Sequence, residues 1–271
     1  MKILTKIIGI VTVVSSLYSC EKESTASFTD FPIIEGYLEV DSQFTVTISR
    51  QIPFDDVVEY SADDINNLSI SVELNQQSYR LEPLGEGKYI NKTLIVAEGD
   101  NYDLAFTFND KNVTAYTNIP YKPINYIQSA TTMYIEKVDI TTGPPTGQPV
   151  QPDPIELNWT NNDNSFYLIL VENLETTLDP IRDFGDRTPP GNRFRKIPTT
   201  SNFDQIRSNE FQYFGTHRVI LYHVLADYAT LYDENSTSSQ NISNPSTSIV
   251  NGYGIFTGLN SDTLYVNVIE S

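Results

Sequence analysis

The sequence predicts an all-β protein made of two antiparallel β-sandwich modules of the immunoglobulin or fibronectin type, with one short helix in the second module. Three observations favour this class. Apolar and polar residues alternate with period two over many short segments, as in strands with one buried face. Short polar turns separate these segments, as in antiparallel sandwiches. The chain has 17 tyrosines against two methionines and one tryptophan, a composition that suits strands better than helical bundles.

The first 19 residues predict a lipoprotein signal peptide. Two lysines precede an apolar run from Ile7 to Leu17, which is too short to span a bilayer because a span takes about 20 apolar residues. The run ends in Leu-Tyr-Ser-Cys, which resembles the lipobox that directs cleavage before a cysteine and acylation of its thiol. We therefore expect cleavage between Ser19 and Cys20 and a lipid such as palmitate on Cys20. The alternative is an ordinary signal peptide with a chance cysteine.

The cysteine content, the net charge and the residues after Cys20 indicate which disulfides, partners and location to expect. Cys20 is the only cysteine, so no disulfide can form within the chain. The formal net charge of −18 argues against a nucleic-acid partner, since like charges repel. Residues 20–30 are polar and small after the cysteine, and we expect them to form a lipidated, flexible tether. Glu21-Lys22-Glu23 resembles a surface-export signal, so we expect outward anchoring at the outer membrane, with the periplasmic face as the alternative.

Residues 31–122 are expected to form the N-terminal sandwich. Alternation is strongest over residues 34–40, 44–49, 68–74 and 102–108. The last of these segments turns at Asn109-Asp110-Lys111 and returns through residues 113–115. Pro120 and Pro123 mark the end of the module, because proline interrupts strand pairing.

Residues 123–271 are expected to form the C-terminal, fibronectin-like domain. Residues 141–154 hold five prolines and two glycines and predict an exposed excursion. The alternating residues 155–159 and the apolar residues 166–171 look like the core hairpin of a fibronectin-type sandwich. Residues 217–225 predict a strand, and the spacing of residues 228, 231 and 232 predicts a short helix. A Ser/Thr/Asn-rich loop at 235–248 leads to a last alternating strand through Leu264, Val266 and Val268.

A long insertion of mixed charge is predicted at residues 174–215, within the second domain. It concentrates positive charge in an acidic chain, and two interpretations remain open. The residues are either solvated charges in a disordered loop or a docking element for an acidic partner or ligand. The residues concerned are Arg182, Arg187, Arg193, Arg195 and Lys196.

Several short motifs occur in a fixed order along the chain. They are the lipobox, Ile34-Glu35-Gly36-Tyr37, Thr45-Val46-Thr47-Ile48-Ser49-Arg50, Gly87-Lys88-Tyr89, Gly99 with Tyr102 and Leu104, Ala115-Tyr116-Thr117-Asn118-Ile119-Pro120, Asn244-Pro245 and Asn251-Gly252-Tyr253-Gly254-Ile255-Phe256-Thr257-Gly258. Together they resemble a family of Bacteroidota lipoproteins catalogued only as a domain of unknown function, whose genes often lie beside those of TonB-dependent outer-membrane receptors. Residues 141–215 match poorly. The resemblance implies a non-enzymatic outer-membrane accessory protein.

The glycines of the last motif also have a structural interpretation. Gly252, Gly254 and Gly258 permit a positive φ or a close approach of two backbones around a final strand. We favour this interpretation over a loop that contacts a ligand.

The sequence shows no set of residues with the spacing of a catalytic site, so we expect no enzyme. With Cys20 lipidated, a hydroxyl nucleophile would need His217 or His223 as its base, and there is no Gly-x-Ser-x-Gly elbow. On one strand these histidines would lie about 20 Å apart, too far to share a metal ion. We therefore expect no metal and no cofactor.

Acidic turns leave a structural calcium ion as an open alternative, at Asp55-Asp56, at Asp63-Asp64 and around Asp179, Asp183 and Asp186. Asp262-Thr263-Leu264 matches a short O-glycosylation signal, which would modify Thr263.

The leading hypothesis is an accessory or ligand-binding subunit of a TonB-dependent transport system, anchored in the outer membrane beside a receptor barrel. The runner-up is a structural subunit of another outer-membrane assembly, such as a secretion or barrel-insertion complex, with residues 174–215 as its docking arm. A surface hydrolase is a third class that no motif supports.

Overall fold

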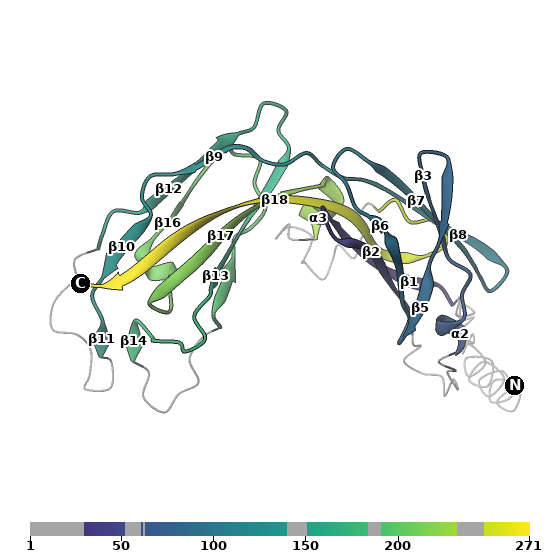
Figure 1. Ribbon diagram of the computed structural model, residues 1–271, viewed down its shortest axis with the longest axis horizontal. Helices are drawn as coiled ribbons and strands as arrows, with labels where there is room; N and C mark the ends of the chain where they lie inside the picture. Colours follow the sequence, from purple (N-terminus) through teal and green to yellow (C-terminus); the bar gives the residue numbers. More distant parts are fainter. Residues whose placement is uncertain (1–29, 52–60, 62, 140–150, 184–190, 232–246) are drawn as a thin grey trace, which may run out of the picture.

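The computed structural model describes residues 30–51, 61, 63–139, 151–183, 191–231 and 247–271. As predicted, this part of the chain is mostly strands in several sheets, with a few short helices (Figure 1). The signal peptide, Cys20, the tether up to residue 29 and most of residues 141–154 and 235–248 lie outside the described residues. In the part described, no helix has the length and apolar character needed to cross a membrane.

The N-terminal sandwich packs part of a large sheet against a four-stranded sheet of order β4-β3-β7-β8. The alternation predicted from the sequence holds, because Ile34 and Leu38 enter the core whereas Tyr37 lies on the opposite face of β1. In that core the Phe44 ring lies 5.4 Å from Tyr102, centroid to centroid. The elements are β1 (Pro32–Glu39), β2 (Gln43–Arg50), α2 (Asp63–Asn66), β3 (Ser71–Leu74), β4 (Gln77–Arg80), β5 (Glu82–Gly85), β6 (Lys88–Ile95), β7 (Asn101–Phe108) and β8 (Lys111–Asn118).

The C-terminal sandwich packs the other part of the large sheet against a three-stranded sheet of order β16-β12-β9. Its core holds Leu157, Trp159, Val219 and Leu221, all of which belong to alternating segments. The short helix predicted near residue 228 is present as α3. The elements are β9 (Ile124–Gln128), β10 (Thr132–Ile135), β11 (Val138–Asp139), β12 (Ile155–Thr160), β13 (Phe166–Asn173), β14 (Arg182–Asp183), β15 (Arg193–Arg195), β16 (Phe203–Ile206), η1 (Ser208–Glu210), β17 (Gly215–Val224), α3 (Ala226–Thr230) and β18 (Tyr253–Glu270).

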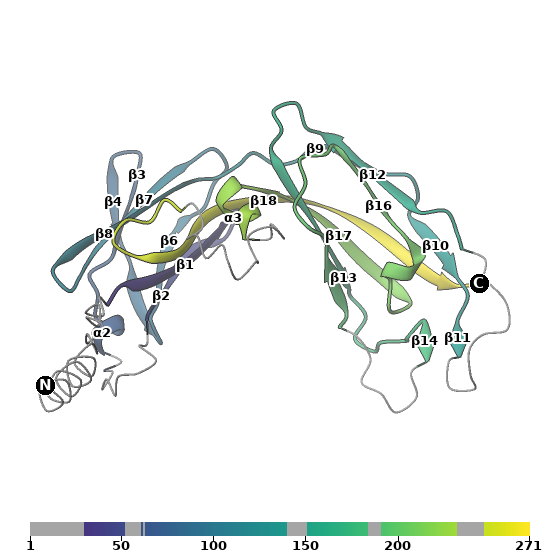
Figure 2. The same cartoon turned by 180° about the vertical axis from the view of Figure 1, so that it is seen from behind.

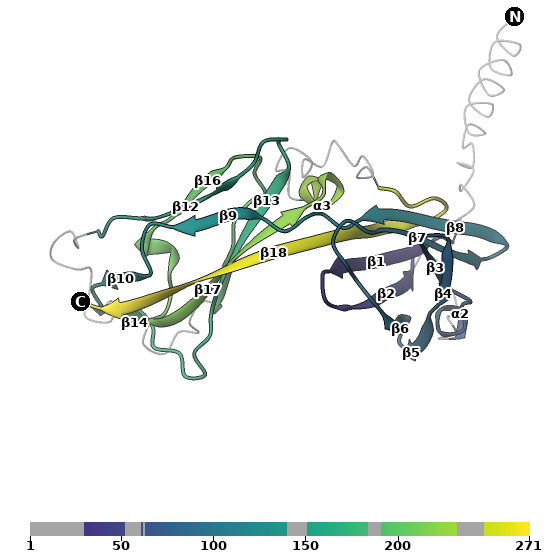
Figure 3. The same ribbon diagram turned by 45° about the horizontal axis from the view of Figure 1, so that its top comes forward.

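Strand β18 is 18 residues long and belongs to both sandwiches. Its first part, residues 253–259, pairs with β1, and residues 259–268 pair with β17. The large sheet is therefore continuous through both halves of the protein, in the order β15-β13-β17-β18-β1-β2-β6-β5, with β10 also paired to β18. Figure 3 shows β18 running from one sandwich to the other beneath the connecting chain.

The predicted role of the glycines in β18 is confirmed. Gly254 has a φ of +105°, and a Cβ built there would lie 2.0 Å from the carbonyl oxygen of Ile34. A Cβ on Gly258 would lie 2.2 Å from the carbonyl oxygen of Asn118 in β8. Side chains at these positions would collide with backbone atoms. Glycine is therefore what lets β18 pass between β1 and β8.

Polar contacts hold the connecting chain between the sandwiches to β18. The Asn260 side chain donates a hydrogen bond of 3.0 Å to the carbonyl oxygen of Pro120. The ammonium group of Lys122 lies 3.0 Å from the carboxylate of Asp262. The connection expected near residues 122–123 is thus attached to the strand that the two sandwiches share.

Two features of the strand pairing differ from the simplest antiparallel arrangement. Both β1 and β10 run parallel to β18, and neither is joined to it by a hairpin. Strands β12 and β13 follow each other like a hairpin, but they lie in opposite sheets and do not pair. Instead, their buried faces meet across the core, where Trp159 lies 5.6 Å from Tyr167, ring centroid to ring centroid.

The segment 174–215 is part of the C-terminal sandwich wherever it is described. It supplies β14, β15, β16 and η1, and its residues 192–199 lie along β13. Five of its apolar side chains are buried, although they are spaced too irregularly among charged residues to show a period in the sequence, whereas Leu174, Leu178, Ile197 and Phe203 are exposed. The buried residues are Ile181, Ile206, Phe211, Tyr213 and Phe214.

Candidate ligand-binding groove

The large sheet has one face toward the two cores and a second face on the inner side of the bend between the sandwiches (Figures 1 and 2). Along β18, Leu264, Val266 and Val268 belong to the C-terminal core, so Thr263 and Tyr265 point to the second face. On β1, Tyr37 and Glu39 lie on this second face as well. We call this surface the concave face.

Helix α3 lies on the concave face where the two sandwiches meet. Ala229 packs with Leu168 of β13 and Val224 of β17 in a small separate cluster. The Asp227 carboxylate accepts a hydrogen bond of 2.9 Å from the hydroxyl of Thr257 in β18. Burial raises the pKa of Asp227 above its usual value, while this hydrogen bond opposes the shift. The helix is therefore attached to the shared strand at a defined place.

Beside α3 is a groove with a volume of about 710 Å³. This size is within the range of about 300–1,000 Å³ that is typical of small-molecule sites. Tyr37 and Glu39 of β1 line one side, and the opposite side is β15, with Arg193, Phe194 and Arg195. Tyr228 of α3 also lines the groove, and its ring packs edge-on against Tyr37 at 6.0 Å between centroids. The floor comes from β13, β17 and β18, through Leu168, Leu170, Tyr222, Val224 and Leu259.

Charge is unevenly distributed across the groove. On the β15 side, Arg193 lies directly across from Glu172 in the strand pairing. The Glu172 carboxylate accepts a hydrogen bond of 2.7 Å from Nε of Arg218 and is engaged in that ion pair. On the β1 side is the Glu39 carboxylate. Burial, with the negative charge of Glu39 as a smaller cause, raises the pKa of the Tyr222 hydroxyl on the floor. The groove therefore has an arginine side and a carboxylate side.

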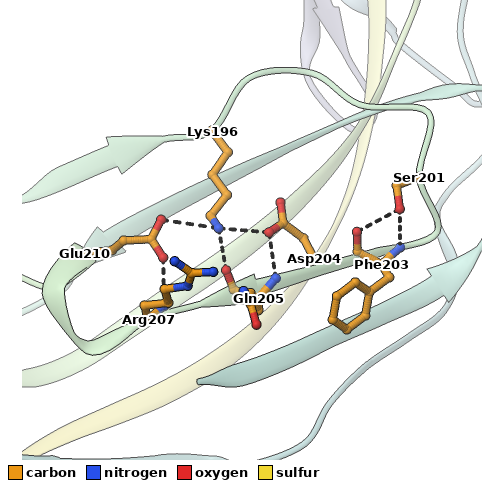
Figure 4. Close-up of polar contacts among 7 residues, drawn as sticks. All are labelled: Lys196, Ser201, Phe203, Asp204, Gln205, Arg207 and Glu210. Carbon is orange, nitrogen blue, oxygen red and sulfur yellow. Dashed lines mark hydrogen bonds and ion pairs between the residues drawn. The ribbon is translucent and has the colours of Figure 1, made fainter. Parts of the chain in front are cut away.

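The basic residues predicted as a docking element have different positions in the structure. Arg193 and Arg195 line the groove, Arg182 lies in β14 and Arg187 lies outside the described residues. The Lys196 ammonium is 2.9 Å from the Asp204 carboxylate and 3.3 Å from that of Glu210, as Figure 4 shows. It also donates to the backbone carbonyl of Gln205 at 2.5 Å. Lys196 thus holds β16 and η1 beside β15.

The two histidines occupy separate surroundings on one face of β17. His217 is buried, with Nδ1 3.0 Å from the carbonyl oxygen of Gly215 and Nε2 3.2 Å from the side-chain nitrogen of Asn173. This geometry fits a neutral ring that donates from Nδ1 and accepts at Nε2. Burial lowers the pKa of His217. His223 bonds to the carbonyl oxygen of Tyr121 at 2.8 Å and stacks on Tyr167.

Of the acidic residues considered for calcium, two that the structure describes form ion pairs. The Asp64 carboxylate is 2.6 Å from the guanidinium of Arg50, and that of Asp179 is 2.7 Å from the ammonium of Lys137. Asp183 lies in β14, whereas Asp55, Asp56 and Asp186 lie outside the described residues. Within the described ranges, no three His, Cys, Asp or Glu side chains are grouped closely enough to hold a metal ion.

Thr263, the candidate for O-glycosylation, is half-buried in the middle of β18. It pairs with Ile220 of β17, which in turn pairs with Leu170 of the groove floor. Its side chain therefore lies on the concave face. Tyr222 pairs with Ser261, the next residue of β18 on the same face. A glycan at this position would occupy part of the concave face.

Sequence reasoning found two of the groove residues, Arg193 and Arg195, through their positive charge. It missed Tyr37, Glu39 and Tyr222. Tyr37 is 48% exposed on the polar side of an alternating strand, and an exposed ring at such a position was the only available signal. The groove joins residues from β1 and β15, which are more than 150 positions apart, and the pattern of a single segment does not show such proximity.

Comparison with known proteins identifies the family of the chain but not its activity. No protein with a curated description matches the sequence. The model of a family described as a domain of unknown function, DUF4249, matches residues 20–264, which include both sandwiches and most of β18. Since this match covers most of the chain, the protein belongs to the DUF4249 family.

Proposed function

We propose that this protein is a lipid-anchored, non-enzymatic subunit of a TonB-dependent transport system of the outer membrane, and that it binds a ligand in the groove of its concave face. One observation supports the proposal that the groove binds a ligand. The groove is lined by residues from both sandwiches, and both sides of the groove belong to one continuous sheet. Binding sites commonly lie where two domains meet, and a continuous sheet limits the rearrangement that binding requires.

The proposed location depends on the sequence. The lipobox ending at Cys20 supports a covalent lipid anchor, and the resemblance to lipoproteins encoded beside TonB-dependent receptors supports a barrel as partner. A body attached by a short tether is held at high effective concentration beside other outer-membrane proteins. In such a setting a modest affinity for a barrel or its ligand is sufficient.

The test is purification of the tagged full-length chain from outer membranes of the bacterium that encodes it, after solubilisation in mild detergent. We expect the protein in the outer-membrane fraction together with a TonB-dependent barrel that mass spectrometry identifies. The Cys20→Ala variant is the control for the anchor, and it should leave the outer-membrane fraction.

Two outcomes would contradict the proposal. One is a wild-type preparation that contains no barrel protein even after cross-linking in intact cells. The other is reproducible recovery of secretion or barrel-insertion subunits in place of a receptor, which would favour a structural role in that assembly.

A further inference from the structure

We propose that the ligand of the groove carries an anionic group on a ring-shaped or otherwise apolar body, and that Arg193 binds the anionic group. This inference rests on the proposed function only in taking the groove as the binding site. It adds the chemical class of the ligand and the end of the groove at which each part of the ligand lies.

Two arginines, Arg193 and Arg195, place positive charge on one side of the groove. The chain as a whole has a formal net charge of −18, so a site for an anion must concentrate positive charge locally. Arg193 is exposed beside the groove, and its cross-strand neighbour Glu172 is engaged by Arg218. No acidic side chain among the described residues forms an ion pair with Arg193. Its guanidinium is thus available for a carboxylate, sulfonate or phosphate group.

The floor of the groove is formed by aliphatic and aromatic side chains. Leu168, Val224 and Leu259 contribute aliphatic surface, and Tyr222 contributes a partly exposed ring. Tyr37 and Tyr228 add aromatic surface next to it. Flat apolar surface of this kind binds ring-shaped molecules through stacking and through burial of apolar area.

Glu39 lies on β1, on the side of the groove opposite β15 and Arg193. Strands β15 and β1 are separated by four strand spacings in the sheet, or roughly 19 Å at about 4.8 Å per spacing. A ligand in the groove can therefore place its anionic group near Arg193 while its apolar body covers Tyr222. The carboxylate of Glu39 repels an anion at the opposite end. The ligand is thus oriented by charge.

Two fluorescent probes that share one aromatic skeleton test this inference. The anionic probe is 8-anilinonaphthalene-1-sulfonate, and the neutral probe is N-phenyl-1-naphthylamine, which lacks the sulfonate. Both are titrated with the purified full chain in mild detergent below its critical micelle concentration, and the Kd of each is measured. The variants are Arg193→Gln and, as a matched control on β4 of the other sandwich, Arg80→Gln.

We expect wild-type protein to bind the anionic probe more tightly than the neutral probe. Arg193→Gln should weaken binding of the anionic probe about fivefold, as expected for one partly solvated charged hydrogen bond, and should leave the neutral probe unchanged. Arg80→Gln should alter neither value. Three results would overturn the proposal. The first is an equal loss of affinity for the anionic probe in both arginine variants, and the second is a loss of affinity for both probes in Arg193→Gln. The third is equal affinity of the wild-type protein for the two probes. These results do not depend on co-purification of a barrel, so this inference and the proposed function fail separately.

Discussion

Gly258 of β18 lies directly against the carbonyl oxygen of Asn118 in β8, with only 2.2 Å between that oxygen and the position of a Cβ. The Gly258 amide donates a hydrogen bond of 3.0 Å to the hydroxyl of Thr117. A side chain would push β18 away from the N-terminal sandwich near the point where the strand leaves it for the C-terminal sandwich.

Gly258→Ala should therefore destabilise the protein by about 2 kcal/mol or more, since overpacking in a close-packed core typically costs about 1–3 kcal/mol. Urea denaturation followed by tyrosine and tryptophan fluorescence measures the change in the free energy of unfolding. Gly191→Ala is the control, because a Cβ there would meet nothing closer than 3.9 Å. Equal stability of the two variants would show that β18 does not pass β8 this closely.

A second prediction concerns the buried histidine. Burial lowers the pKa of His217, so the unfolded chain takes up a proton on this ring at a higher pH than the folded protein does. The free energy of unfolding should thus be fully retained above the ordinary histidine pKa of about 6.5 and decrease as the pH falls below it. His217→Gln should make this pH dependence weaker, because glutamine does not titrate.

The measurement is the free energy of unfolding from pH 8 to pH 5 for wild type and variant. His223→Gln retains His217 and should keep the wild-type dependence. A wild-type slope that persists in His217→Gln would mean that other groups cause the acid sensitivity.

A third prediction distinguishes a basic side chain that stabilises the fold, Lys196, from the basic side chains that line the groove. The side chain of Lys196 is 17% exposed and pairs with the carboxylates of Asp204 and Glu210. Lys196→Met should lower the free energy of unfolding by about 1 kcal/mol, because two partly buried carboxylates lose their partner. It should leave the Kd for the anionic naphthalene probe unchanged. An altered Kd with unchanged stability would instead assign Lys196 to the groove.

Much of the fold could be predicted because single strands carry their own signal. The alternation of Ile34 and Leu38 with Glu35 and Tyr37 places β1 in a half-buried sheet whatever its neighbours are. The same reasoning predicted β2, β7 and the C-terminal part of β18. Local spacing also predicted the helix near Tyr228.

What the sequence did not reveal depends on contacts between distant segments. Residues 253–258 and the alternating residues 264–268 were separate signals, and only pairing with β1 and β17 shows that they form one strand. The segment 174–215 has buried residues without a period, since Ile181, Phe211 and Phe214 belong to the C-terminal core but lie outside the strands. The groove depends on both features, so its aromatic residues could not be identified from the sequence.

In the proposed binding mode, a residue of the N-terminal sandwich and a residue of the C-terminal sandwich bind the same ligand. The most direct test compares the Kd for 8-anilinonaphthalene-1-sulfonate between Tyr37→Ala and Tyr116→Ala. These tyrosines are equally exposed, at 48%, but only Tyr37 lines the groove.

We predict that Tyr37→Ala weakens binding about fivefold, in line with about 1 kcal/mol for an aromatic contact, and that Tyr116→Ala leaves the Kd unchanged. An unchanged Kd in Tyr37→Ala, or equal weakening in both variants, would contradict a groove shared by the two sandwiches.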